Sequence, residues 1–143
     1  MAEEKKPPVS LASLMTSSKT VEIDYPGRDG MKVKLCYLAR EELVKLRKRC
    51  LSTKWDKKSR QPIEEMDDDK FIIEYCKAVI KGWSGLKYRY LEELLLVDIS
   101  DLNPDDCLPY TSANAELLMK NANDFDTWVT ETVGDLENFT GNK

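Results

Sequence analysis

The 143-residue sequence contains no histidine, and this absence excludes several common catalytic arrangements. It rules out Ser-His-Asp and Cys-His nucleophiles, HExxH zinc sites and an imidazole general base. Carboxylate, lysine or thiol chemistry remains open to the chain, but no recognisable motif brings such groups together. The sequence therefore predicts a protein that is not an enzyme and that uses neither a metal nor a cofactor.

Long apolar segments are also missing. The longest run of large aliphatic residues is Leu94-Leu95-Leu96-Val97, whereas a membrane-spanning helix needs about 20 apolar residues. The charged segment Met1–Pro8 is not followed by an apolar stretch, so it does not fit a signal peptide. We expect a cytoplasmic protein that does not contact a membrane.

The cysteines lack the spacing of a zinc or thiol-exchange motif. Cys36, Cys50, Cys76 and Cys107 include no CxxC pair, and such pairs are typical of both kinds of site. Each cysteine has apolar neighbours, among which a reduced thiol behaves as a small hydrophobic group. We expect four buried free thiols; a four-thiolate metal site and disulfide bonds are the less favoured alternatives.

Charge is distributed unevenly along the chain, although the net charge is only −4. Residues 1–60 hold 15 basic and 8 acidic residues, a net charge of +7, whereas residues 61–143 hold 7 and 18, a net charge of −11. This asymmetry favours contact with an anionic partner or head-to-tail self-association. The alternative is that the two halves pair with each other within one fold.

The first 38 residues are predicted to form an arm and a hairpin. Residues 1–19 contain few large apolar residues, so we expect a flexible N-terminal arm. Residues 20–38 contain two segments of alternating polarity around a turn with proline and glycine, which predicts an antiparallel β-hairpin. Its apolar face must be covered by the rest of the domain or by another copy. Its polar face is expected to pair two acidic with two basic residues, Glu22 and Asp24 with Lys32 and Lys34.

Residues 39–139 show mainly helical periodicity. A helix beginning at Ala39 has its apolar residues on one side. The segment Ser52–Glu65 is polar, contains Pro62 and is interpreted as a loop. Asp67 and the two aspartates that follow it are expected to cap a core helix that ends at Gly82.

Two further helices are expected near the C-terminus. A short one is capped by Thr111 or Ser112, and a longer one starts at Asn123-Asp124. Residues 140–143 are expected to be a frayed tail. The sequence thus predicts a mainly α fold with a small N-terminal antiparallel β-hairpin, an α+β protein in which about four helices form one compact domain over residues 20–139.

A basic face follows the predicted hairpin. Residues 40–60 hold nine basic and three acidic side chains, a net charge of +6. Three interpretations remain open: a solvated face, a surface for an acidic protein, or a small nucleic-acid-binding module. Trp55 is the only aromatic residue in this segment that can stack on a base, so nucleic acid is not the favoured partner. The basic residues expected to act in such a module are Lys45, Lys48, Arg49, Lys57 and Lys58.

A series of short motifs resembles a known family. The series is Lys81-Gly82-Trp83-Ser84-Gly85-Leu86, Leu91-Glu92-Glu93-Leu94-Leu95, a segment from Leu108-Pro109-Tyr110 to Leu118, and a final set with Phe125, Trp128-Val129 and Asp135-Leu136-Glu137-Asn138-Phe139. In their order and spacing, over roughly residues 20–139, these motifs resemble the tail assembly chaperones of long-tailed bacteriophages.

Each motif also has a structural interpretation. Gly82 and Gly85 permit a sharp reversal of the chain, and Trp83 and Leu86 are expected to fill its inner side. The order of the motifs, rather than any one of them, carries the resemblance.

The resemblance implies a partner and a task. Members of that family bind the long, largely helical tape-measure protein, keep it soluble and help to recruit tail-tube subunits. They act in the host bacterial cytoplasm and commonly have a longer form made by ribosomal frameshifting. The residues expected to contact the partner are aromatic residues that the helical stripes do not need internally: Trp55, Trp83, Tyr88, Tyr90 and Phe139.

Overall fold

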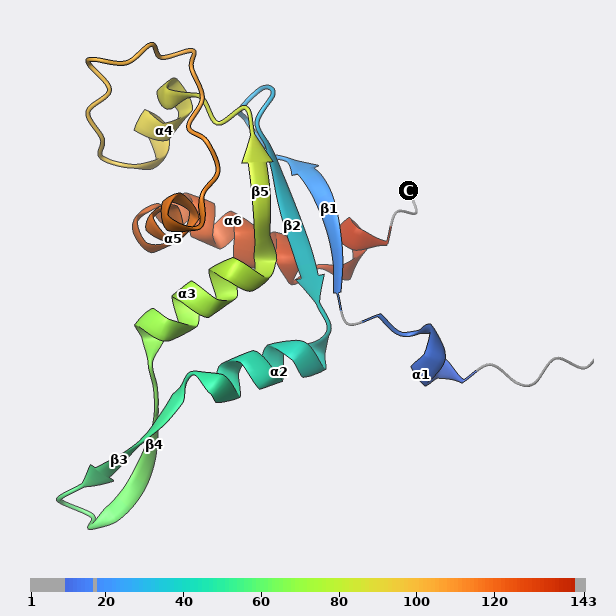
Figure 1. Cartoon of the computed structure of the whole chain (residues 1–143), viewed down its shortest axis with the longest axis vertical. Coiled ribbons are helices and arrows are strands. Elements are labelled where there is room, and N and C mark those ends of the chain that lie inside the picture. Colours follow the sequence, from blue (N-terminus) through green and yellow to red (C-terminus); the bar gives the residue numbers. More distant parts are fainter. Residues whose placement is uncertain (1–9, 17, 141–143) are drawn as a thin grey trace, which may run out of the picture.

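The computed structural model describes residues 10–16 and 18–140 (Figure 1). These residues form an α+β fold with five strands in two sheets, six α-helices and a short 3₁₀ helix. The prediction of a mainly α fold with one small hairpin is therefore wrong. Three of the five strands lie outside that hairpin, in segments whose sequence indicated a loop or a helix end.

The elements begin as helices and β-hairpins in alternation and end with a single strand followed by helices. The helices are α1 (Leu11–Leu14), α2 (Arg40–Arg49), α3 (Asp68–Val79), α4 (Tyr88–Leu94), α5 (Ser112–Asn121), α6 (Asn123–Val133) and the 3₁₀ helix η1 (Leu136–Phe139). The strands are β1 (Ser18–Asp24), β2 (Lys32–Leu38), β3 (Leu51–Asp56), β4 (Gln61–Met66) and β5 (Ile80–Ser84). None of the helices in the described ranges has the length and apolar content that crossing a membrane requires.

The main sheet has three antiparallel strands in the order β1-β2-β5. β1 and β2 form the predicted hairpin in the predicted register, with Glu22 opposite Lys34 and Asp24 opposite Lys32. The predicted arm at 1–19 lies partly outside the described residues. Its described part contains α1 and the first two residues of β1.

The third strand of this sheet follows α3 without a loop. α3 begins as predicted, because the Asp67 carboxylate accepts a hydrogen bond from the Lys70 backbone N–H at 3.1 Å. It ends at Val79, since Ile80 adopts extended backbone and pairs with β2. Gly82 therefore lies inside β5 and does not end the helix as predicted. β-branched residues at this boundary suit a strand as well as a buried helix face, so helical periodicity alone could not mark it.

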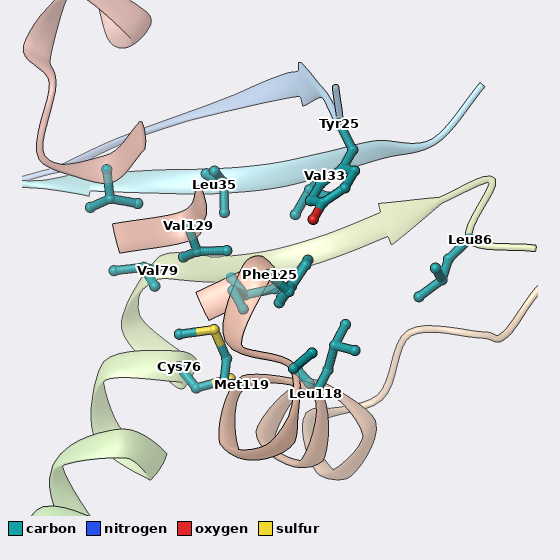
Figure 2. Packing of buried hydrophobic residues seen from close by; sticks show 14 of the residues in the cluster. Tyr25, Val33, Leu35, Cys76, Val79, Leu86, Leu118, Met119, Phe125 and Val129 are labelled. Atoms are coloured by element: carbon teal, nitrogen blue, oxygen red, sulfur yellow. The ribbon is translucent and has the colours of Figure 1, made fainter. Parts of the chain in front are cut away.

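The hydrophobic core lies on one face of the main sheet. Helices α3 and α6 pack against β2, and α5 packs against both helices (Figure 1). Phe125 and Val129 of α6 are fully buried in the same cluster as Val33 and Leu35 of β2 (Figure 2). Burial of such side chains contributes about 25 cal/mol per Å², so this layer stabilises the fold.

The C-terminal helices begin where the sequence indicated. Thr111, not Ser112, caps α5, because its hydroxyl accepts a hydrogen bond from the Asn114 backbone N–H at 3.0 Å. α6 begins at Asn123 as predicted. The chain then turns into η1, whose Phe139 is only 1% exposed. Residues 141–143 of the predicted tail lie outside the described residues.

A second hairpin replaces the loop predicted at Ser52–Glu65. β3 and β4 pair in an unbroken antiparallel register, and the hairpin projects from the ends of α2 and α3, away from the main sheet (Figure 1). The Asp56 carboxylate holds the turn by accepting hydrogen bonds from the Lys58 backbone N–H at 3.1 Å and the Ser59 hydroxyl at 2.7 Å. Pro62 is accommodated because each strand has only one partner.

The reversal after β5 requires one glycine rather than two. Gly85 has a φ of +71°, and an added Cβ atom there would overlap the carbonyl group of Gly30. At Gly82 an added Cβ would meet only the Lys34 side chain, at 3.5 Å. As expected for this turn, Leu86 is fully buried, while Trp83 is half-buried.

The cysteines are free thiols, as predicted, but they do not share one environment. Cys36, Cys50 and Cys76 are buried, whereas Cys107 is exposed. The expectation of four buried thiols is therefore wrong for Cys107. This residue lies in the irregular connection between α4 and α5, where apolar sequence neighbours do not ensure burial.

Candidate binding groove

An open groove of about 380 Å³ lies between α2, α3 and α6. Most of its lining is apolar, and the end of β2 and helix α5 each contribute a side chain. The lining residues are Leu38, Leu43, Arg47, Phe71, Ile72, Tyr75, Met119, Asp126, Thr130, Val133 and Gly134. A groove of this volume admits a few large side chains of a partner.

The groove exists because α2 buries only part of its apolar side. Leu46 of α2 and Cys50, which follows the helix, are fully buried, whereas Leu43 is half-buried and forms one wall. On the facing wall, Phe71 and Tyr75 lie one turn apart on α3 with ring centroids 5.6 Å apart. Both rings are half-buried and remain partly accessible to solvent.

Polar side chains from three helices line the groove beside this apolar surface. The Thr130 hydroxyl of α6 donates a hydrogen bond to the Asp126 carboxylate at 3.3 Å. Burial raises the pKa of Tyr75, and the negative charge of the Asp126 carboxylate raises it further. A hydrogen bond with the Thr130 hydroxyl lowers this pKa by a smaller amount than burial raises it. At neutral pH the Tyr75 phenol is therefore uncharged and able to donate a hydrogen bond.

Arg47 and Asp126 supply opposite charges to the same groove from α2 and α6. In the described part of the chain, no ion pair within 4.0 Å joins these two residues. Each charge can therefore pair with a group on a partner without breaking an internal salt bridge. Charge complementarity of this kind fixes the orientation of a bound segment more than it increases affinity.

The thiol of α3, Cys76, does not line the groove. Burial raises the pKa of the Cys76 thiol on α3 to about 11, so at neutral pH this thiol is protonated and a weak nucleophile. Among residues 10–16 and 18–140, no group of three His, Cys, Asp or Glu side chains is placed to hold a metal ion. The apolar walls can bury a ligand, and the polar side chains can orient it.

None of the five predicted contact residues lines the groove. Trp83 is half-buried, and its Nε1 donates a hydrogen bond to the Leu108 carbonyl at 2.9 Å. Tyr88 is half-buried against the core. The Tyr90 hydroxyl donates to the Asp29 carbonyl at 2.9 Å and so connects α4 to the β1–β2 turn. These three residues lie at the α4 end of the main sheet.

The other two predicted contact residues are placed at opposite extremes of exposure. Phe139 is buried, and its ring centroid lies 5.3 Å from that of Tyr37. Trp55 is 64% exposed on the projecting β3–β4 hairpin. The structure therefore does not assemble the five aromatic residues into one surface.

The predicted basic residues lie on two different elements. Lys45 and Lys48 lie on α2 together with Val44, outside the groove. Arg49 is exposed at the last position of α2. The remaining two occupy the turn of the second hairpin, at Lys57 and Lys58.

The residues of the groove are not recognisable from the sequence as a binding site. Leu43, Ile72 and Tyr75 belong to helical stripes that the apolar periodicity assigns to the core. Leu43 and Arg47 lie one turn apart on α2, and this spacing indicates that a charged side chain shares the helix face that carries Leu43. Periodicity could not reveal that α2 leaves this face open, because that depends on where α3 and α6 lie.

Comparisons with known protein families, with curated proteins and with solved structures find no match.

Proposed function

We propose that this protein is a tail assembly chaperone of a long-tailed bacteriophage. In this proposal it binds the tape-measure protein, keeps it soluble and helps to recruit tail-tube subunits in the host bacterial cytoplasm. The observation that carries the proposal is the open apolar groove between α2, α3 and α6, which suits the apolar face of a client helix. The resemblance of the sequence motifs to that family is the reason for proposing the tape-measure protein as the client.

The proposed mechanism is reversible binding without covalent chemistry. A client helix lays apolar side chains that recur every three or four residues against Leu43, Phe71 and Ile72. Covering these side chains lowers the population of the exposed, aggregation-prone client by mass action. Many copies on one long client add avidity, so that each groove needs only modest affinity.

The charges of the groove give the proposal a preferred client. A helix with an acidic side chain near Arg47 and a basic side chain near Asp126 satisfies both groups, whereas the reversed orientation places like charges together. The groove therefore favours one direction of the client helix. Helical segments without charges next to their apolar face bind more weakly.

Two neighbouring residues of α2 provide a matched test. Leu43 lines the groove, whereas Val44 is 44% exposed and lies outside it. Each variant, Leu43→Ser and Val44→Ser, is co-expressed with helical fragments of tape-measure proteins, and the soluble fragment is measured. Leu43→Ser should weaken binding at least about tenfold, and Val44→Ser should bind like the wild type.

Two results would contradict this proposal. One is a wild-type protein that keeps no tape-measure fragment soluble. The other is equal client binding by both variants, with melting curves that show both to be folded. The melting curve of Leu43→Ser shows whether a binding defect is caused by unfolding. If it is, the milder variant Leu43→Ala is tested in its place.

A nucleic-acid-binding module is the second candidate, and one observation favours it. The exposed Trp55 ring lies on the same projecting hairpin as Lys57 and Lys58, which combines a stacking surface with phosphate-binding charges. This function predicts binding to single-stranded DNA whose affinity falls steeply with the logarithm of salt concentration. It also predicts that the double variant Lys57→Glu/Lys58→Glu loses that binding, while client binding in the groove is unchanged.

A further inference from the structure

Helix α1 presents apolar side chains to solvent. Leu11, Leu14 and Met15 are 73%, 66% and 58% exposed, and no residue of α1 is buried. The helix is nevertheless capped, because the Ser10 hydroxyl accepts a hydrogen bond from the Ser13 backbone N–H at 3.1 Å. Among the described residues, the chain thus holds a short apolar helix that no other element covers and, separately, an apolar groove that is open.

The attachment point of α1 lies at the edge of that groove. β1 begins at Ser18, which stands opposite Leu38 of β2, and Leu38 lines the groove. Two residues separate Met15 from Ser18, and an extended connection of this length reaches up to about 11 Å. Figure 1 shows α1 beside the end of the sheet from which α2 starts.

The present position of α1 offers it less apolar surface than the groove does. Met15 and Thr16 border a shallow depression whose opposite side is formed by Ala39, Glu41 and Glu42. Two of these three residues carry carboxylates, and a charged group does not provide an apolar surface against which a methionine side chain can be buried. The groove on the other side of α2 offers leucine, phenylalanine and isoleucine side chains instead.

We infer that residues 10–16 are an internal ligand of the groove, in which Leu11, Leu14 and Met15 occupy the apolar part until a client displaces them. This regulation of client binding rests on the proposed function, but the docking of the arm requires no client. The segment 10–16 has no charged residue, so it leaves Arg47 and Asp126 unpaired. A client helix that pairs with these charges makes contacts that the arm cannot make, and it therefore replaces the arm.

The tether makes such competition effective. A short connection gives the arm an effective concentration in the millimolar range, so weak intrinsic affinity is sufficient for docking. The apparent dissociation constant of a client rises as the fraction of open grooves falls. If the arm fills the groove in nine of ten molecules, its removal strengthens client binding about tenfold.

An apolar dye measures the docking of the arm without any client. The test variant is Leu11→Ser/Leu14→Ser/Met15→Ser, and the control is Leu117→Ser, a 56% exposed leucine of α5 that does not line the groove. Binding of 8-anilinonaphthalene-1-sulfonate should increase several-fold in the test variant and stay at the wild-type level in the control. Adding Leu43→Ser to the test variant should remove the increase, which locates the dye in the groove. Equal dye binding by the wild type and the test variant overturns the inference.

A spin label reports where the arm lies. Cys107→Ser leaves the three buried thiols, so Ser13→Cys in that background provides one accessible labelling site. A label on α1 should broaden the methyl signal of Met119, which lines the groove, and the broadening should not change on dilution. No broadening, or broadening that is lost on dilution together with a dimer mass, overturns the inference; the second result assigns the groove to the arm of a second copy.

The two proposals can fail separately. If the arm variant changes dye binding and the label broadens Met119, but no tape-measure fragment binds any variant, the proposed function is wrong and docking of the arm stands. If fragments bind the wild type and the arm variant equally well, docking of the arm does not regulate the groove, and the inference is wrong while the proposed function stands.

Discussion

The indole Nε1 of Trp83 donates a hydrogen bond to the backbone carbonyl of Leu108, 2.9 Å away. The Trp83 ring also meets the Tyr110 ring edge-on, with centroids 5.1 Å apart. The Tyr110 hydroxyl in turn donates to the carbonyl of Ile80 at 3.1 Å. The segment after α4 is thereby joined to β5, the last strand of the main sheet, and these contacts give Trp83 a structural role.

Substitution of Trp83 should reduce stability in two steps. Trp83→Phe keeps an aromatic ring but removes the donor, which costs about 1 kcal/mol. Trp83→Ala also removes most of the half-buried surface and costs about 2–4 kcal/mol. Urea unfolding measures both values. An unchanged unfolding curve for Trp83→Ala, together with weaker client binding, would instead make Trp83 a contact residue.

The two glycines of the reversal should differ sharply in their tolerance of alanine. Gly85→Ala forces a side chain onto a residue with a φ of +71° and against the Gly30 backbone, so it should cost at least about 2 kcal/mol. Gly82→Ala meets only the flexible Lys34 side chain and should change stability by less than about 1 kcal/mol. Thermal unfolding of the two variants checks this prediction, and equal losses would contradict it.

Stability should fall in alkaline solution because of Cys76. Burial raises the pKa of this thiol from 9.0 to about 11, so the folded protein keeps the proton at a pH at which the unfolded chain has lost it. The stabilisation is complete below about pH 9 and is lost as the pH rises through about 11, by up to about 3 kcal/mol. Urea unfolding across this range measures the loss.

Two cysteine variants separate this effect from other titrations. The free energy of unfolding of Cys76→Ala should decline less over the same pH range. That of Cys107→Ala, a variant at an exposed position, should decline like that of the wild type. Tyr25 and Tyr75, whose pKa values burial also raises, contribute to the decline in all three proteins. Parallel curves for the wild type and Cys76→Ala would show that the thiol is not responsible.

The β3–β4 hairpin should be dispensable for folding. The backbone N–H of Asp67 donates to the Cys50 carbonyl at 2.8 Å, so the two ends of the hairpin lie together. Replacement of residues 51–66 by a short Gly/Ser linker should leave the methyl NMR spectrum of the core intact and cost less than about 1 kcal/mol. A protein that fails to fold without this segment would show that the hairpin supports the core.

The same deletion should separate the two candidate functions. Client binding in the groove should survive it, because no lining residue lies between 51 and 66. Any binding to single-stranded DNA should disappear with Trp55, Lys57 and Lys58. Loss of client binding in a folded deletion variant would place the client site on the hairpin instead.

Sequence patterns predicted elements well where the information is local. The register of Glu22 with Lys34, and the caps Asp67 and Thr111, depend on residues a few positions apart or on a single turn. The β3–β4 hairpin was missed because nearly all of its residues are exposed, so it has no buried face to impose alternation. The groove was missed because half-buried residues such as Leu43 and Tyr75 have the same periodicity as core residues.

By itself, the sequence determined the chemistry that is excluded by the absence of histidine, the β1–β2 hairpin and the starts of α3 and α5. The tertiary structure decided whether Ile80 continues a helix or joins a sheet, because its strand partner lies in β2, far away in the sequence. It also decided which apolar faces stay open. Exposure of a helix face depends on the elements that pack around it, and Leu43 and Val44 show that neighbours in one helix can face a groove and open solvent.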